Sequence, residues 1–168
     1  MLHADSPGLT AARVVNSPIG ELILVASARG IIRICFGECS DYAMVIGDSP
    51  LQDHLNAAAM QLDEYFAGER RDFHLPLDPA GTRFQQSVWQ QVQLVALGQT
   101  ATYGDIAGRI GNPAAARAVG SALGANPVPL IIPCHRVIGA NSSLTGFSGG
   151  LEIKRLLLGH ESALTAGR

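Results

Sequence analysis

A proline-rich stretch, residues 126–139, constrains the fold of this 168-residue chain more than any other segment. Its apolar run at residues 130–132 predicts a short buried strand. Pro133 ends that strand, because proline has no N–H to donate to a sheet. Cys134 and His135 follow directly. A thiol and an imidazole therefore stand side by side at the end of a rigid buried segment, a setting that suits thiolate chemistry.

The adjacency of Cys134 and His135 limits how they can cooperate. Neighbouring residues point to opposite faces of a strand, so His135 is not expected to touch the Cys134 sulfur directly. If His135 acts as a base, a bridging water is the expected relay, with a carboxylate behind the ring to fix its tautomer. The alternative is an unreactive buried cysteine beside a core histidine. An isolated pair would favour that alternative, and the flanking prolines and Gly139 weigh against it.

Composition limits the class of protein and its compartment. A hydrophobic fraction of 47% excludes a disordered chain. No apolar run approaches the ~18 residues of a membrane span, and the first residues lack a secretory signal. The odd count of three cysteines argues against a disulfide framework and for a reducing cytoplasm. Cys35 and Cys39 would need His3, His54 or His74 to complete a zinc site, and a core role for Cys35 is favoured instead.

The two halves of the chain differ in charge, although the net charge of the whole is −2. Residues 1–82 hold five Lys/Arg and eleven Asp/Glu, a balance of −6. Residues 83–168 hold seven Lys/Arg and three Asp/Glu, a balance of +4. The asymmetry suggests a polyanion as the partner of the second half, with a solvated surface as the alternative.

The first half predicts a small sheet and one helix. Strands are expected at residues 12–18, 20–27 and 31–36, with turns between them, and an antiparallel meander is the simplest arrangement. Apolar residues recur at helical spacing over residues 50–67, which predicts a helix that Gly68 ends. Two prolines and a glycine then precede the change of charge. The expected organisation is a first domain at 1–75, a linker at 76–81 and a second domain at 82–168.

The second half predicts a helix-turn-helix pattern. A capping box at residues 82–85 opens a helix, and a tight turn joins two further helices at residues 102–110 and 114–123. The last of these carries small side chains and one long, charged one, Arg117. Such a helix cannot read much sequence, but it suits the minor groove with one side chain inserted into the base stack. The alternative is plain helix packing with Arg117 on the surface.

A glycine-containing loop and a final helix complete the chain. Residues 139–150 form the loop, and its glycines allow backbone to come close to a ligand. The final helix is expected from Leu151 to about His160. Ile153, Leu156 and Leu157 are expected inside, and Glu161 comes directly after the helix as a candidate for a carboxylate on its buried face.

The order and the spacing of these motifs resemble those of the O6-alkylguanine-DNA alkyltransferases. The resemblance is to the bacterial type in particular, which has a domain before the catalytic one. The match is close over residues 82–162 and loose over 10–75. The resemblance implies an α+β fold: an N-terminal, ribonuclease H-like domain with a small antiparallel sheet and helix, and a C-terminal helical domain with a winged helix-turn-helix. It rests on segments 84–89, 115–120, 126–129, 133–137 and 146–151.

The resemblance also implies an activity. Members of the family repair DNA by direct reversal, moving an alkyl group from O6 of guanine, or less readily O4 of thymine, to their own cysteine. Cys134 would be this acceptor, irreversibly and in a single turnover, as a suicide S-methyltransferase that needs no cofactor and no metal. The partner would be double-stranded DNA containing O6-alkylguanine. The protein would be a cytoplasmic monomer that does not bind membranes. Whether it binds cooperatively along DNA does not follow from the resemblance.

Each candidate site residue takes its role from this resemblance. His135 would draw the Cys134 proton through a water, and Glu161 would orient His135. Tyr103 would donate a proton to the guanine ring nitrogen, so that the base leaves neutral. Asn126 would brace the turns around the site.

Other residues would bind the base and the DNA. Arg117 would fill the gap left by the flipped nucleotide. Backbone carbonyls of Cys134 and Val137 would accept from the guanine amine, and the Ser148 N–H would donate to O6. The pocket lining and the close approach to DNA would involve Leu123, Phe147, Ala116 and Gly120. Phe147 departs from the tyrosine that is usual there, which removes a hydroxyl from the pocket wall.

Two other functions compete with this one. A non-catalytic binder of alkylated DNA would recruit other repair proteins, but relatives of that kind lack the acceptor cysteine. A Cys-His hydrolase would need an oxyanion site and repeated turnover. A change in the mass of the protein itself distinguishes the transferase from both.

Overall fold

The computed structural model describes residues 10–39 and 50–166, and it divides the chain into two compact units, Met1–Pro79 and Ala80–Arg168. The division falls within the expected linker at 76–81. Residues 76–78 pair with the first unit: Pro76 O accepts from the Ile31 N–H, and the Asp78 N–H donates to Ile31 O, each at 2.9 Å. No helix in the described part of the chain is long and apolar enough to cross a membrane.

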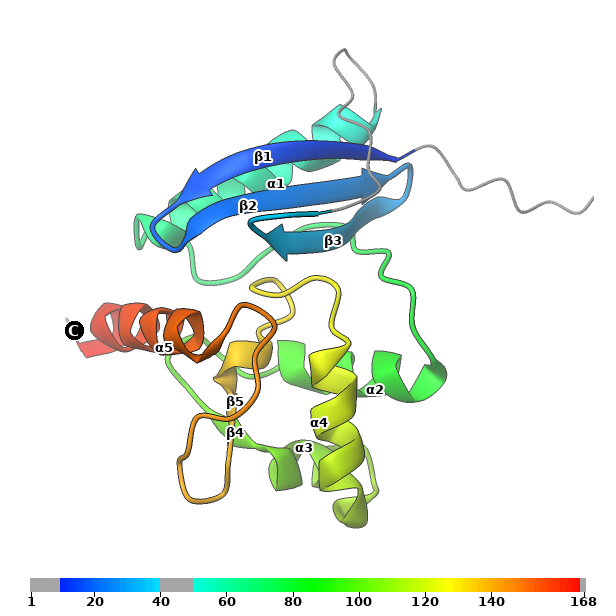
Figure 1. Ribbon diagram of the computed structural model, residues 1–168, viewed down its shortest axis with the longest axis vertical. Coiled ribbons are helices and arrows are strands. Elements are labelled where there is room, and N and C mark those ends of the chain that lie inside the picture. The colour runs from blue at the N-terminus through cyan, green and yellow to red at the C-terminus, as the bar shows by residue number, and fades with distance from the viewer. Residues whose placement is uncertain (1–9, 40–49, 167–168) are drawn as a thin grey trace, which may run out of the picture. The chain divides into compact units, whose positions relative to one another are not determined.

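The first unit is a three-stranded antiparallel sheet with one helix against it (Figure 1). The sheet order is β1-β2-β3, and the strands lie within one residue of the predicted bounds. Leu22 and Leu24 of the sheet and Leu55 and Leu62 of the helix are fully buried, and the helix packs against all three strands. The elements are β1 (Ala11–Ser17), β2 (Gly20–Ser27), β3 (Gly30–Phe36) and α1 (Pro50–Phe66).

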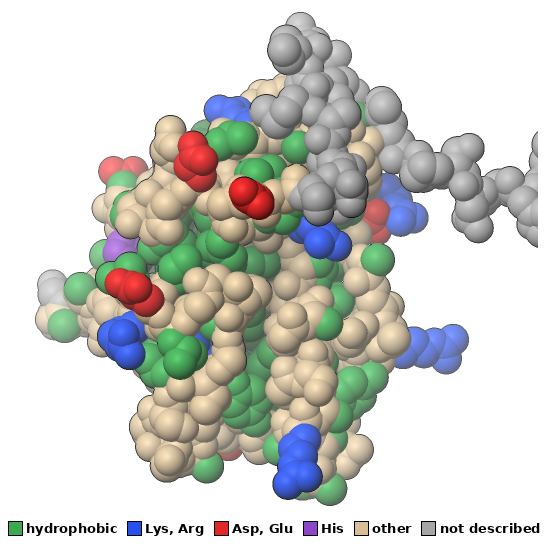
Figure 2. Space-filling model, viewed as in Figure 1, with side chains coloured by type: hydrophobic (Ala, Val, Ile, Leu, Met, Phe, Trp, Pro, Cys, Tyr) green, Lys and Arg blue, Asp and Glu red, His purple; other side chains and the backbone are tan. Residues whose placement is uncertain are grey.

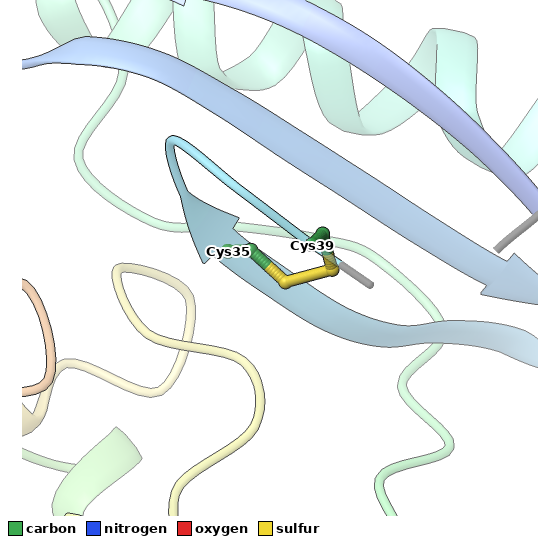
Figure 3. The surroundings of a disulfide bond; sticks show 2 residues. All are labelled: Cys35 and Cys39. Atoms are coloured by element: carbon green, nitrogen blue, oxygen red, sulfur yellow. A yellow bond between two sulfur atoms is a disulfide. The ribbon is translucent and has the colours of Figure 1, made fainter. Parts of the chain in front are cut away.

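A disulfide joins Cys35, in β3, to Cys39 in the loop that follows (Figure 3). Gly37 has a φ of 76°, and this left-handed turn brings the two cysteines to a Cα–Cα distance of 5.7 Å. The expectation of a core Cys35 without a disulfide is therefore wrong. The zinc alternative loses both its thiols to this bond, and His3 lies outside the described residues. Cys134 is the free cysteine of the described chain.

The second unit is mainly helical (Figure 1). Two short strands, β4 and β5, pair in parallel, with Ala101 opposite Val137 and Thr102 opposite Ile138. The elements are α2 (Arg83–Gln93), β4 (Ala101–Thr102), α3 (Tyr103–Arg109), the 3-10 helix η1 (Pro113–Ala115), α4 (Ala116–Gly124), the 3-10 helix η2 (Cys134–Arg136), β5 (Val137–Ile138) and α5 (Leu151–Ala166).

Local sequence signals fix these helices. The capping box predicted at Thr82 is present, with reciprocal bonds between Thr82 and Gln85. A second box, formed by Thr102 and Asp105, opens α3. The buried Trp89 indole N–H donates to Ala122 O at 2.8 Å and so ties α2 to α4. These contacts place the two helices of the helix-turn-helix against a common support.

Residues 130–132 do not form the predicted strand. Leu130 has a φ of 76°, and the segment is a buried turn that holds one isolated bridge, between Pro129 and Ile132. The Ile132 N–H donates to Val128 O at 3.0 Å, which closes the turn on itself. Because the backbone is satisfied locally, the apolar run is buried without a sheet partner. Cys134 consequently opens the 3-10 helix η2 rather than following a strand end.

Helix α5 is longer than predicted, and the set of residues on its buried side differs from the predicted set. It continues to Ala166, so that Glu161 lies inside the helix and not after it. The buried residues are Lys154, Leu157 and Glu161, whereas Leu156 is 52% exposed. The predicted burial of Leu157 and Glu161 is confirmed, whereas that of Leu156 is wrong, and the buried Lys154 was not predicted.

Candidate active site around Cys134

The Cys134 thiol is buried and held by the side chain of Asn126. Asn126 Nδ2 donates to Cys134 Sγ at 3.2 Å and to Ile132 O at 2.9 Å, while its Oδ1 accepts from the Val128 N–H at 3.0 Å. Burial raises the pKa of the Cys134 thiol, and the Asn126 hydrogen bond and the Lys154 charge offset this only in part. The resting side chain is therefore a neutral thiol near pH 7.

His135 faces Glu161 rather than the thiol. Its Nε2–H donates to Glu161 Oε1 at 2.7 Å, and both side chains are fully buried. Burial lowers the pKa of His135, although Glu161 opposes the shift, so the imidazole is neutral near pH 7. With the proton on Nε2, Nδ1 is left as an acceptor. That atom is buried and has no hydrogen-bond partner within the described chain.

Arg136 surrounds the same carboxylate. Its Nε donates to Glu161 Oε2 at 2.9 Å, its Nη2 donates to Oε1 at 3.0 Å, and its Nη1 donates to Val95 O at 2.6 Å. The Gly98 N–H adds a bond to Oε2 at 3.2 Å. Burial would raise the pKa of Glu161, but the hydrogen bonds and charges of His135 and Arg136 hold it at about 2. Glu161 is thus an ionised carboxylate inside the protein.

Lys154 brings a second buried cation to the site. Its Nζ donates to Val137 O and to Thr145 O, each at 2.7 Å. Burial lowers the pKa of Lys154, and its interaction with Cys134 works against that shift. No role was predicted from the sequence for Arg136 or Lys154. Their positions in the sequence offered a signal. Arg136 directly follows Cys134 and His135, and Lys154 falls on the inward side of the last helix.

Two aromatic side chains contact residues near the site, Tyr103 through Thr145 and Phe147 through His135. Tyr103 is half-buried at the start of α3, and its hydroxyl bonds to Thr145. A Cβ added to Gly120 of α4 would stand 3.7 Å from the Tyr103 ring, so the two helices approach closely there. Phe147 meets the His135 ring edge-on, with centroids 6.4 Å apart.

The exposed face of α4 carries small side chains and one long side chain. Its exposed residues are Arg117 and the small residues Ala118, Ser121 and Gly124. Ala116 is half-buried, whereas Leu123 is buried on the opposite face. Within the second unit, the Lys and Arg side chains visible in Figure 2 stand apart from one another and form no patch. Ser148 is exposed in the loop before α5.

The described residues contain no group of three or more His, Cys, Asp or Glu side chains that could hold a metal ion. The chemical groups gathered around residues 134–136 are instead a thiol, a neutral imidazole, an ionised carboxylate and two buried cations. This set can move a proton from sulfur and stabilise the charges that result, which is what a cysteine nucleophile requires.

Comparison with known proteins identifies the family. Residues 11–79 match the ribonuclease-like domain of 6-O-methylguanine DNA methyltransferase, and residues 83–163 match its DNA binding domain. The methylated-DNA–protein-cysteine methyltransferase of Methanosarcina acetivorans is 44% identical over 147 residues, covering 86% of this chain and 94% of the relative. The chain belongs to this methyltransferase family.

Other members of the methyltransferase family agree. The constitutive enzyme of Bacillus subtilis is 43% identical over 151 residues, covering 87% of this chain and 92% of the relative. The crystal structure of Mycobacterium tuberculosis OGT in complex with DNA matches with a TM-score of 0.82 and 42% identity, covering 92% of this chain and 94% of that one. The α+β fold expected for the methyltransferase, with its two domain types, is confirmed.

Proposed function

We propose that this methyltransferase repairs DNA by direct reversal. An alkyl group on O6 of guanine, or less readily O4 of thymine, in double-stranded DNA moves irreversibly to Cys134, once per molecule. One observation carries the proposal: the free thiol of Cys134 is buried beside a neutral His135 that is backed by the ionised Glu161. A suicide acceptor needs this arrangement, because the thiol must be activated only at the moment of transfer.

The first step is activation of the thiol. A water bridges Cys134 Sγ to His135 Nδ1, the buried acceptor, and carries the thiol proton to the imidazole. Glu161 holds the imidazolium that forms, through the 2.7 Å bond to Nε2. The Lys154 charge favours the thiolate in the same way. Asn126 keeps the sulfur in place through its 3.2 Å bond.

The second step is transfer of the alkyl group. The thiolate attacks the carbon of the alkyl group, a C–S bond forms, and the C–O6 bond breaks with its electron pair moving to the guanine. Tyr103 gives a proton to the guanine ring nitrogen, so the base leaves neutral. The imidazolium proton returns through solvent to Tyr103, which balances the protons of the reaction.

The remaining residues bind the base and the duplex. Carbonyl oxygens of Cys134 and Val137 accept from the guanine amine, the Ser148 N–H donates to O6, and Leu123 and Phe147 line the pocket. Val137 O already accepts from Lys154, and its second lone pair remains for the base. On α4, the small residues around Ala116 and Gly120 allow a close approach to the minor groove. Arg117 fills the place of the flipped nucleotide.

The proposal needs no cofactor, and it places the protein in the cytoplasm as a monomer on DNA. Support comes from Cys134, which must stay reduced in order to react and takes no part in the Cys35–Cys39 disulfide. Every group in the two steps above belongs to the second unit of one chain, so no second subunit is required.

Intact-mass spectrometry tests the function. After incubation with duplex DNA containing O6-methylguanine, the protein should gain the mass of one CH₂, once, because a methyl group replaces the thiol hydrogen. Peptide mapping should place the methyl on Cys134, and Cys134→Ser should gain nothing. Modification of Cys35 or Cys39, or repair of several lesions by one molecule, would sink the proposal.

A further inference from the structure

Thr145 makes two hydrogen bonds with the hydroxyl of Tyr103. The Tyr103 O–H donates to the Thr145 carbonyl at 3.3 Å, and the Thr145 hydroxyl donates to the Tyr103 oxygen at 3.0 Å. Thr145 thus accepts a hydrogen bond from the tyrosine hydroxyl and also donates one to the tyrosine oxygen. Thr145 lies in the loop before α5, 42 residues from Tyr103 in sequence.

The position of Thr145 is fixed from inside the protein. The buried Lys154 ammonium donates to the Thr145 carbonyl at 2.7 Å and to Val137 O at 2.7 Å. Charge-assisted bonds of this length are stronger than neutral ones. The exposed Thr145 is therefore tied to β5 and α5, and its hydroxyl is held where it meets Tyr103.

The two bonds to Tyr103 differ in strength, and the difference matters for proton donation. The Thr145 carbonyl is engaged by Lys154 at 2.7 Å, and the Tyr103 proton reaches it only at 3.3 Å. That proton can turn to another acceptor at little cost. The Thr145 hydroxyl, in contrast, stays directed at the Tyr103 oxygen after the proton has left. A donor already directed at an oxygen where negative charge develops needs no reorganisation during the reaction.

We infer that Thr145 is a positioning residue for alkyl transfer, whose hydroxyl stabilises the oxygen of Tyr103 while Tyr103 gives its proton to the leaving base. The proton moves from Tyr103 to the ring nitrogen of the base, and the negative charge left on the Tyr103 oxygen is met by the Thr145 O–H. The inference rests on the proposed function, because it assigns Thr145 a part in that same reaction.

Replacement of the hydroxyl tests this role. Thr145→Val keeps the shape and the backbone carbonyl that Lys154 holds, and it removes only the donor. Single-turnover transfer from duplex O6-methylguanine should slow by about tenfold or more, because a hydrogen bond to a charged group contributes at least about that factor. Thr145→Ser restores the donor and should stay near the wild-type rate. Thr100→Val, an exposed threonine outside the site, is the matched control.

A double-mutant cycle separates this role from a merely structural one. In a Tyr103→Phe background there is no phenolic oxygen to stabilise, so Thr145→Val should cause no further loss of rate. An equal loss in both backgrounds, or an unchanged rate in Thr145→Val alone, would overturn the inference. If valine lowers the melting temperature, the Ser and Ala variants give the same comparison.

The outcome also separates this inference from the proposed function. A wild-type protein that transfers methyl to Cys134 while Thr145→Val transfers equally fast overturns only the role of Thr145. A wild-type protein that gains no methyl overturns the proposed function, and the role of Thr145 with it.

Discussion

Nε2 of His135 lies 2.7 Å from Oε1 of Glu161, and neither side chain is exposed to solvent. Because Glu161 stays ionised, with a pKa of about 2, the bond fixes the imidazole proton on Nε2 and leaves Nδ1 as the proton acceptor. The basicity of His135 therefore depends on the charge of Glu161.

Glu161→Gln should slow alkyl transfer by on the order of a hundredfold or more, because the amide cannot stabilise an imidazolium as a carboxylate does. Affinity for DNA should remain nearly unchanged, since Glu161 is buried. Single-turnover rates at saturating DNA and a binding titration measure the two quantities separately. Glu152→Gln, an exposed change on the same helix, is the control. An unchanged transfer rate in Glu161→Gln would rule out this role of His135.

Arg136→Lys should lower the free energy of unfolding by about 2 kcal/mol or more, even though it keeps the charge. Lysine cannot reproduce the planar set of donors that reaches both oxygens of Glu161 and Val95 O. Urea unfolding of the variant, compared with the exposed control Arg155→Lys, measures the difference. Equal stability of the two variants would show that a point charge beside Glu161 is sufficient.

Stability should fall steeply in acid. The pKa of Glu161 is about 2 in the folded protein against an ordinary value of 4.5, so below pH 4.5 the unfolded chain binds a proton that the native protein does not. The free energy of unfolding should decrease by ~3 kcal/mol between pH 4.5 and 2 from this group alone. His135, whose pKa is lowered from 6.5, adds a loss of the same sign that begins near pH 6.5.

Urea unfolding over a pH series checks the acid loss. The Glu161→Gln variant should lack the part of the slope between pH 4.5 and 2, because its amide does not titrate. A slope that is identical in the variant and the wild type would assign the acid sensitivity to other carboxylates.

Arg117→Ala should slow repair of duplex DNA much more than transfer from the free base O6-benzylguanine, which needs no flipping. Extrusion of a base costs a few kcal/mol, and Arg117 is the long side chain on the exposed face of α4. Single-turnover rates at saturating duplex distinguish this from a loss of phosphate binding, which would leave the saturated rate intact. Arg155→Ala serves as the control. Equal slowing on both substrates would remove Arg117 from base flipping.

The sequence predicted those parts of the fold whose signals are local. The three strands, α1 and the capping box at Thr82 lie where periodicity, turn residues and hydrogen-bonding side chains place them. The turn at residues 130–132 was missed because its backbone is satisfied within the same stretch, by Val128 O and the Asn126 side chain, and not by a neighbouring strand. An apolar run by itself does not distinguish a strand from a buried turn.

The site was predicted less completely than the fold. Cys134, His135 and Glu161 were named, and the structure joins His135 to Glu161. Arg136 and Lys154 were missed, because a sequence does not show that a charged residue is buried. Glu161 was placed on the buried face of the last helix, but Lys154 was not, because its burial depends on a bond to Val137 O, 17 residues away in sequence.

The place of Glu161 on α5 has a consequence for the order in which the site is assembled. His135 is followed by its carboxylate partner 26 residues later in the chain. During synthesis the nucleophile and its base therefore leave the ribosome before the group that makes the base effective. The pairing of His135 with Glu161 is therefore complete only when α5 has docked, so the last helix of the chain finishes a site whose nucleophile lies well before it.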